Sequence, residues 1–268
     1  MPCAKKTART TSNPPFPLAK PQNYNNSPPT FGPFDGALLI DKPREWTSHD
    51  VVAKVRGQYK LKKVGHCGTL DPNATGLLVL VLGKATKLSN KLMADDKVYE
   101  GTARFGEATD SYDSDGETTE TLPVPPLSVD QLNEATEEFR GDLMQVPPMV
   151  SAVKKDGVPL YKLARKGKEV EREPKLIHIY KYQFSDYSEP EGNFIVTCTK
   201  GTYVRSLVHD LGNKLGCGAH LSALRRTRSG KLDVAEAITL EDLLKLSKPE
   251  LEKRVIPILK LAELAVAG

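Results

Sequence analysis

The strongest constraint on the fold is a fully apolar run that follows a glycine-rich loop. Residues 77–82 are all leucine or valine, and six residues match the length of a buried β-strand. This is the most apolar stretch of the chain, and it is far shorter than the roughly 20 residues that a membrane-spanning helix needs. The sequence therefore predicts a fold organised around a buried strand, and no membrane partner.

The rest of the chain alternates between strand and helix patterns. Strands are predicted at 37–40, 98–105, 177–184 and 194–199, and helices at 128–139, 203–215 and 240–246. The pattern has no regular strand–helix–strand rhythm and no internal repeat. The expected fold class is α+β, with a mixed, mostly antiparallel central sheet flanked by helices.

Composition divides the chain into three parts. Residues 1–34 hold few apolar and no acidic residues, and this predicts a disordered basic segment. Organellar transit peptides have a similar composition, so both interpretations stay open. Residues 35–245 are the expected folded domain and residues 246–268 a C-terminal tail. Because the cysteines are few and scattered, we expect an intracellular protein, located in the cytoplasm or, with a transit peptide, in a plastid or mitochondrion.

The motifs of several cofactor classes are missing from the sequence. The four cysteines, at positions 3, 67, 198 and 217, make no CxxC pair, and neither a P-loop nor a dinucleotide-binding fingerprint occurs. Residues 110–116 resemble a calcium loop. Aligning Gly116 with the glycine of that loop, however, puts Leu122 where a bidentate glutamate is needed. The sequence therefore predicts no metal ion and no cofactor.

The loop before the apolar run is the first candidate site. Residues 65–76 contain three glycines and Pro72, which fix an irregular backbone around Asp71 and place it near His66. A carboxylate held in this way suits catalysis. The alternative is an Asp-Pro turn in which Asp71 only accepts hydrogen bonds from nearby amides.

A second candidate is Arg205, in the first turn of the predicted helix 203–215. The helix dipole disfavours a cation at that position, so an arginine there suggests an anionic partner. The alternative is a solvent-exposed side chain.

Clusters of positive charge decide whether a net charge of only +4 indicates a nucleic-acid partner. Basic residues gather around Tyr161 and again after residue 224, although acidic residues are interspersed in the first cluster. Such a cluster is either a solvated surface or a set of contacts to an RNA backbone. The residues predicted to make those contacts are Lys154, Lys155, Lys162, Arg165, Lys166, Arg225 and Arg226.

Taken in order, the motifs resemble those of the TruB family of tRNA pseudouridine synthases. The resemblance runs from about residue 36 to about residue 239 and is dense, which makes it specific. The motifs that carry it are LIDKP (39–43), WTS (46–48), GHCGTLDPNATG (65–76), KVY (97–99), FGEATDSYDSDG (105–116), QVPPMVSA (145–152), GTYVR (201–205) and LRR (224–226).

The resemblance implies a catalytic set. Asp71 would be the catalytic aspartate, and Arg205 would pair with it, lower its pKa and fix its orientation. Tyr99 would stack on the target uracil and help to remove the proton at C5. The implied reaction isomerises the T-loop uridine of tRNA, at position 55, after the base has been flipped out of its stack.

The resemblance also implies roles in substrate binding. His66 would fill the vacancy that the flipped base leaves, Tyr203 and Leu224 would line the uracil pocket, and Lys42 would support the loop or a phosphate. Residues 146–175 would form a thumb-like insertion that closes over the T-arm. The chain would act as a monomer, on tRNA and on T-arm-like stem-loops of mRNA, and it would lack the C-terminal PUA-type domain of bacterial members.

Two other functions remain open at this stage. An RNA chaperone would use the same basic thumb and His66 without needing catalysis. A guide-dependent relative from box H/ACA particles shares the catalytic motifs, but such relatives keep the PUA domain and lack the thumb.

Overall fold

A computed structural model describes the chain except for residues 2–29, 152, 156, 165, 169 and 267–268. A compact unit spans Phe31–Gly268. The predicted basic segment 1–34 lies almost entirely outside the described residues, and so does Arg165. Among the helices of the described part, none is both long and apolar enough to cross a membrane.

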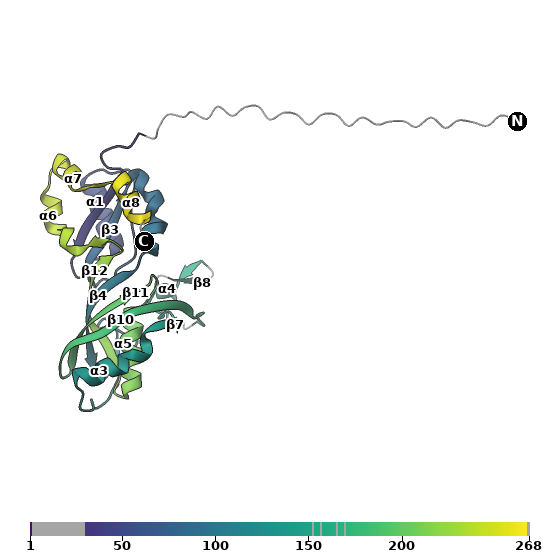
Figure 1. Cartoon of the computed structure of the whole chain (residues 1–268), viewed down its shortest axis with the longest axis vertical. Coiled ribbons are helices and arrows are strands. Elements are labelled where there is room, and N and C mark those ends of the chain that lie inside the picture. Colours follow the sequence, from purple (N-terminus) through teal and green to yellow (C-terminus); the bar gives the residue numbers. More distant parts are fainter. Residues whose placement is uncertain (2–29, 152, 156, 165, 169, 267–268) are drawn as a thin grey trace. The chain divides into compact units, whose positions relative to one another are not determined.

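One large sheet organises this unit, with the strand order β14-β1-β3-β12-β4-β11-β10-β7 (Figure 1). The β1–β14 and β12–β3 pairs are parallel, and the other neighbours along this order are antiparallel. The prediction of a mixed, mostly antiparallel sheet is confirmed. The strands are β1 (Gly36–Lys42), β3 (Thr75–Leu82), β4 (Lys97–Phe105), β7 (Gly141–Gln145), β10 (Lys175–Ser188), β11 (Glu191–Cys198), β12 (Ala219–Ser229) and β14 (Ile238–Thr239).

Shorter strands extend this sheet or pair in twos. β2 (Val64–His66) pairs with β3, β13 (Leu232–Asp233) with β12, and β15 (Ile256–Pro257) with β1. Two separate hairpins consist of β5 (Glu107–Thr109) with β6 (Thr118–Thr121), and of β8 (Lys154–Lys155) with β9 (Val158–Pro159).

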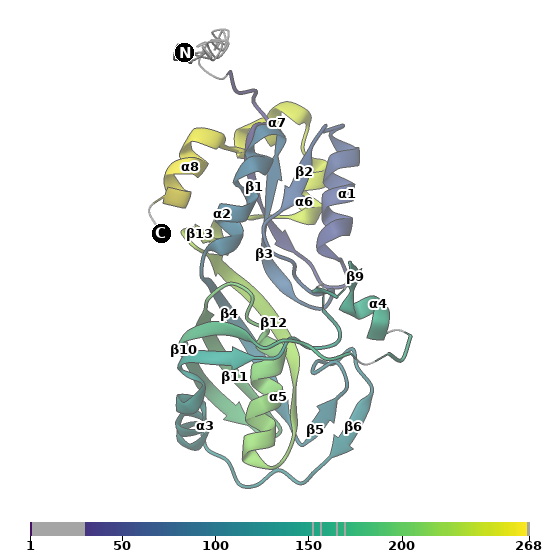
Figure 2. The same ribbon diagram turned by 90° about the vertical axis from the view of Figure 1, so that its right-hand side faces the viewer.

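Helices cover both ends of the sheet (Figure 2). α3 (Val129–Thr136) packs on β10 and α5 (Val204–Leu215) on β12, whereas α1 (Ser48–Gln58) packs on β2. A capping box begins α3, since Ser128 and Gln131 exchange hydrogen bonds with each other's backbone. The remaining helices are α2 (Ser89–Ala94), α4 (Leu160–Ala164), α6 (Leu240–Lys245), α7 (Lys248–Arg254) and α8 (Ile258–Val266), with 3-10 turns η1 (Gly83–Leu88), η2 (Glu137–Phe139) and η3 (Val234–Glu236).

The apolar run is explained by two hydrophobic cores, one on each face of β3. Leu78, Leu80 and Leu82 point into the larger core. Leu77 and its alternating neighbours point into a smaller core, which contains Leu261 of α8. A strand that is buried on both faces has no position for a polar residue, and so its sequence is continuously apolar rather than alternating.

The segment predicted as a C-terminal tail is folded. Residues 246–266 contain α7, β15 and α8, and β15 pairs with β1. Leu251 and Leu261 are fully buried, and a Cβ at Gly36 would collide with the carbonyl oxygen of Ile256. The prediction was wrong because each helix is too short to show a clear apolar period.

Candidate active site

Asp71 lies in the loop between β2 and β3, and its position is fixed through the residues on either side of it, Leu70 and Pro72. The Ser48 hydroxyl accepts a hydrogen bond from the Leu70 amide at 2.9 Å and donates one to the Leu70 carbonyl at 3.2 Å. On the other side, the Lys42 ammonium donates to the carbonyl of Pro72 at 3.1 Å. Asp71 therefore stands between two fixed residues, with its side chain 44% exposed.

Lys42 is fully buried, and two further carbonyls, those of Pro43 and Trp46, accept hydrogen bonds from its ammonium. Burial lowers the pKa of Lys42 to about 8. Of the two roles that the sequence left open for Lys42, this placement fits support of the loop. A phosphate has no access to its ammonium.

Gly76 ends the loop and lets it approach the centre of the sheet. Its φ of +95° is a left-handed conformation, and a Cβ there would collide with the backbone of Arg226 on β12. Glycine is therefore required on two grounds: the backbone conformation, and the close packing of β3 against β12.

Arg205 lies in the first turn of α5, and its guanidinium is almost completely buried. Its Nε lies 3.1 Å from Asp71 Oδ2, and its Nη1 lies 3.1 Å from Asp113 Oδ2. The guanidinium also donates to the carbonyls of Ser111 at 3.0 Å and Val150 at 2.8 Å. Two carboxylates thus supply the anionic partners that the position of Arg205 suggested, and the interpretation of an exposed arginine is wrong.

Asp113 was not singled out as a site residue from the sequence, although it lies in the FGEATDSYDSDG motif. The sequence offers this pattern as a calcium loop and as part of the TruB resemblance, without a separate role for Asp113. In the structure, Asp113 Oδ1 accepts hydrogen bonds from the Ser111 hydroxyl at 2.5 Å and from the Asp115 amide at 3.1 Å, and Oδ2 faces Arg205. Asp113 therefore shares the guanidinium with Asp71.

This sharing changes the expected electrostatics of Asp71. Burial raises the pKa of the Asp71 carboxyl, Asp113 and Asp115 raise it further, and Arg205 opposes them. The sequence-based expectation that Arg205 lowers this pKa is confirmed for the contribution of Arg205, but burial and the two other carboxylates outweigh it. The cation is divided between two carboxylates, so it offsets only part of the loss of hydration.

We predict that Asp113→Asn moves the acid limb of the pH–activity profile to lower pH. We expect Asp71 to act as a nucleophile or as a base, and both roles need the ionised carboxylate, so activity should be lost as the pH falls through its pKa. Removing the charge of Asp113 removes one cause of the raised pKa. Loss of one charge-assisted hydrogen bond to Arg205 should also lower kcat by about 10- to 100-fold. Initial rates across the acidic range measure both effects, and a limb that stays in place contradicts the shared-cation arrangement.

A cavity of about 540 Å³ opens over this cluster, a volume in the range of small-ligand sites. Tyr99 projects into it from β4, Tyr203 comes from the start of α5, and Leu224 comes from β12. Gln145 fixes Tyr203, because its side-chain amide bonds to the backbone N–H of Tyr203 at 2.8 Å and to its carbonyl at 3.0 Å. The cavity thus joins a paired carboxylate to aromatic and apolar walls, which suits a flat base attached to a sugar.

Two family models match consecutive parts of the chain. Residues 56–204 match the TruB family pseudouridylate synthase (N terminal domain), and residues 205–265 match the tRNA pseudouridylate synthase B C-terminal domain. The chain belongs to the TruB family. The second match extends through the segment that had been expected to be a tail.

Curated relatives cover most of the chain. A tRNA pseudouridine synthase B from Opitutus terrae is 54% identical over 228 residues, which are 85% of this chain and 95% of the relative. One from Syntrophotalea carbinolica is 49% identical over 216 residues, which are 81% of this chain and 70% of the relative.

Solved structures give the same fold. A structure of a Cbf5–Nop10–Gar1 complex aligns with a TM-score of 0.68 and 30% identity, and covers 87% of this chain and 62% of the matched chain. An H/ACA ribonucleoprotein bound to a substrate RNA that contains 2′-deoxyuridine aligns with a TM-score of 0.64 and 28% identity. This chain spans less than two thirds of the length of these two solved chains.

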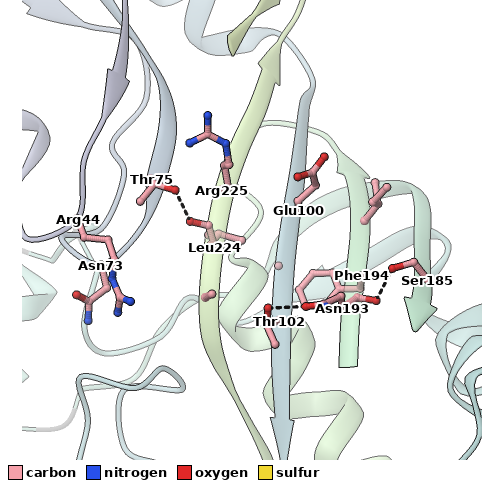
Figure 3. A pocket seen from close by; sticks show the side chains of 13 residues that line it. Arg44, Asn73, Thr75, Glu100, Thr102, Ser185, Asn193, Phe194, Leu224 and Arg225 are labelled. Atoms are coloured by element: carbon pink, nitrogen blue, oxygen red, sulfur yellow. Dashed lines mark hydrogen bonds between the residues drawn. The ribbon is translucent and has the colours of Figure 1, made fainter. Parts of the chain in front are cut away.

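Arg225 and Arg226, which the charge pattern of the sequence grouped into one basic cluster, lie on opposite faces of β12. Arg225 makes a two-point ion pair with Asp41, at 2.9 and 2.7 Å. It lines a separate cavity together with Glu100, its cross-strand partner on β4 (Figure 3). Arg226 is only 1% exposed, so the structure does not support it as a contact to an RNA backbone.

His66 is partly buried and does not line the active-site cavity. Its ring lies 5.1 Å from that of His49, edge to face. Burial lowers its pKa, so the imidazole is neutral at physiological pH. It lies at the start of the Asp71 loop as an uncharged, flat side chain.

The predicted thumb is described only in part. Its described segments include the β8–β9 hairpin and α4 (Figure 2). Lys155, Lys162 and Lys166 are exposed, and the Lys155 ammonium donates to the Glu171 carbonyl at 2.8 Å. Positive charge therefore lies on an exposed segment of residues 146–175.

Proposed function

We propose that the protein is a stand-alone tRNA pseudouridine synthase that isomerises the T-loop uridine at position 55. The observation that carries the proposal is the ion pair between Asp71 and the buried Arg205, at the wall of a cavity that Tyr99 and Tyr203 also line. Curated relatives about 50% identical over most of the chain carry the name tRNA pseudouridine synthase B. The identity to these relatives is higher than the 30% identity to the Cbf5 chain, and this supports a stand-alone enzyme over a guide-dependent one.

The reaction breaks the N1–C1′ bond of uridine and forms a C5–C1′ bond. C5 loses its proton and N1 gains one, so the net change is an isomerisation without transfer of electrons to another molecule. Asp71 starts it as an ionised carboxylate, either by attacking C1′ or by removing the C2′ proton. Arg205 holds that carboxylate in place. Tyr99 offers a ring face to the uracil, and its hydroxyl helps to remove the C5 proton by accepting it while its own proton passes to N1 or to water.

The target base must leave the folded T-loop before it can enter the cavity. His66 is proposed to fill the vacancy in the RNA, a role that suits its neutral ring beside the catalytic loop. Tyr203 and Leu224 then line the uracil pocket. The protein is proposed to act as a monomer, and stem-loops of mRNA that resemble the T-arm would fit the same site.

The test is a tritium-release assay on a T-arm stem-loop and on full-length tRNA, both labelled at C5 of uridine and supplied without guide RNA. Release from position 55 in both substrates is expected. An inactive wild-type protein would refute the proposal. Activity that depends on an added guide RNA would favour the box H/ACA type of enzyme, and accelerated tRNA folding without any tritium release would favour a chaperone.

We predict that the exposed thumb lysines contribute to RNA affinity and not to chemistry. The double variant Lys162→Ala/Lys166→Ala should raise KM, leave kcat within about twofold, and reduce the slope of log affinity against log salt by roughly 0.9 for each phosphate that is no longer neutralised. Filter binding between low and moderate salt measures the slope. The double variant Lys253→Ala/Lys260→Ala removes the same charge from exposed positions on α7 and α8 and serves as the control. An equal effect of the two double variants would contradict a role for the thumb.

A further inference from the structure

Arg226 is the largest fully buried side chain of the protein's described part, and the chemistry above does not use it. It lies on β12 at the centre of the sheet. Its direct cross-strand neighbours are Tyr99 on β4 and Gly76 on β3. It is therefore next to the strand that carries the aromatic wall of the cavity and to the strand that follows the Asp71 loop.

Its guanidinium is held by backbone carbonyls. Nε donates to the Leu77 carbonyl at 2.8 Å, and Nη2 donates to the Gly68 carbonyl at 3.2 Å. Among the residues that the structure describes, no carboxylate lies within salt-bridge distance of it, in contrast to its neighbour Arg225. A buried cation without an anionic partner is less stable than an apolar side chain of the same size. Packing alone therefore gives no reason for an arginine at this position.

Tyr99 supplies that reason. Side chains of directly opposed residues project from the same face of a sheet. The Arg226 guanidinium accordingly lies beside the Tyr99 phenol and favours its ionised form. Because the guanidinium can only donate, it can offer a hydrogen bond to the phenol oxygen but cannot take the hydroxyl proton. Both side chains also line the active-site cavity.

We infer that Arg226 is a positioning residue that acts through Tyr99: its guanidinium is fixed by the Asp71 loop and β3, and it sets the orientation of the Tyr99 hydroxyl toward the uracil. This inference rests on the proposed function. The Arg226 side chain thereby connects Gly68 of the Asp71 loop with Tyr99. This connection fixes the position of the aromatic wall relative to the Asp71 carboxylate.

The charge of Arg226 also acts on Tyr99. Burial raises the pKa of the Tyr99 phenol, and Cys198 on β11 and Asp71 in the loop raise it too, whereas Arg226 lowers it. Removing the guanidinium should therefore move the pKa of this phenol upward. A guanidinium remote from the phenol would leave that pKa unchanged.

The experiment compares Arg226→Met and Arg226→Lys with the wild type, each with 3-fluorotyrosine at position 99 for ¹⁹F titration. Arg226→Met should raise the titration midpoint of the phenol. It should also lower kcat about 10- to 100-fold, which corresponds to the loss of one charged hydrogen bond, and it should change KM less than threefold. Arg226→Lys should restore part of both, because it keeps the charge. Arg228→Met is the matched control, since Arg228 lies two residues along β12, is 56% exposed at its side chain and pairs with Asp233.

Coupling to Tyr99 gives the second measurement. In a Tyr99→Phe background, Arg226→Met should lower the single-turnover rate no further, because the hydroxyl that it positions is gone. Fully additive losses, or an unchanged ¹⁹F midpoint in Arg226→Met, would overturn the inference. Because the titration needs no turnover, it is readable in an inactive variant. An inactive wild type would instead refute the proposed function.

Discussion

Replacing Asp71 by asparagine is expected to lower kcat at least about a thousandfold while leaving the fold and RNA binding intact. The amide has the same shape as the carboxylate, but it can neither attack C1′ nor accept the C2′ proton. Ser48 and Lys42 hold the loop through the backbone of Leu70 and Pro72, and neither of these contacts involves the Asp71 side chain. The loop should therefore keep its place when the charge is removed.

The measurement is single-turnover tritium release, with the RNA dissociation constant and the thermal midpoint determined on the same preparation. Asp130→Asn makes the same chemical change at an exposed position in the first turn of α3 and should match the wild type. A kcat within tenfold of the wild type in Asp71→Asn would assign the chemistry to another group. A loss of RNA binding in proportion to the loss of rate would make Asp71 a binding residue.

The sequence predicted the fold where one local pattern determined one element. The apolar run at 77–82 required a strand buried on both faces, and the period of 203–215 required a helix with one apolar face; both are present. Local patterns were insufficient where a short element depends on distant packing. α8 is such a case, because its buried Leu261 belongs to a core shared with β1 and β3.

The same limit applies to the site. The expected contact between Asp71 and Arg205 is present. Asp113, the second carboxylate that contacts Arg205, is separated from both residues by long stretches of sequence, and the loop after β5 brings it into the site. Arg225 and Arg226 looked like one basic cluster because no strand was predicted there. Once they lie on β12, alternation sends adjacent residues to opposite faces, one to an ion pair and the other to the interior.

Replacing Arg205 by methionine is expected to impair both activity and stability. The substitution keeps much of the buried volume but leaves Asp71 and Asp113 facing each other without a cation, and it leaves the Ser111 and Val150 carbonyls without this donor. Removing one partner of a buried ion pair destabilises a protein by about 3–5 kcal/mol. The lower end, roughly 3 kcal/mol, applies here because the Asp71 side chain is 44% exposed to water.

The pH dependence separates the two roles of Arg205. Since Arg205 lowers the pKa of Asp71, its removal should raise that pKa and move the acid limb of the activity profile to higher pH, opposite to the shift expected for Asp113→Asn. The rate at a pH above the limb should still fall on the order of 100-fold, because the carboxylate is no longer held in place. Arg140→Met, which breaks an exposed ion pair with Glu137, should change stability by less than about 1 kcal/mol and leave the limb unmoved. If Arg205→Met shifted the limb in the same direction as Asp113→Asn, the guanidinium would not be what keeps Asp71 ionised, and the charge of the bound RNA would have to be considered instead.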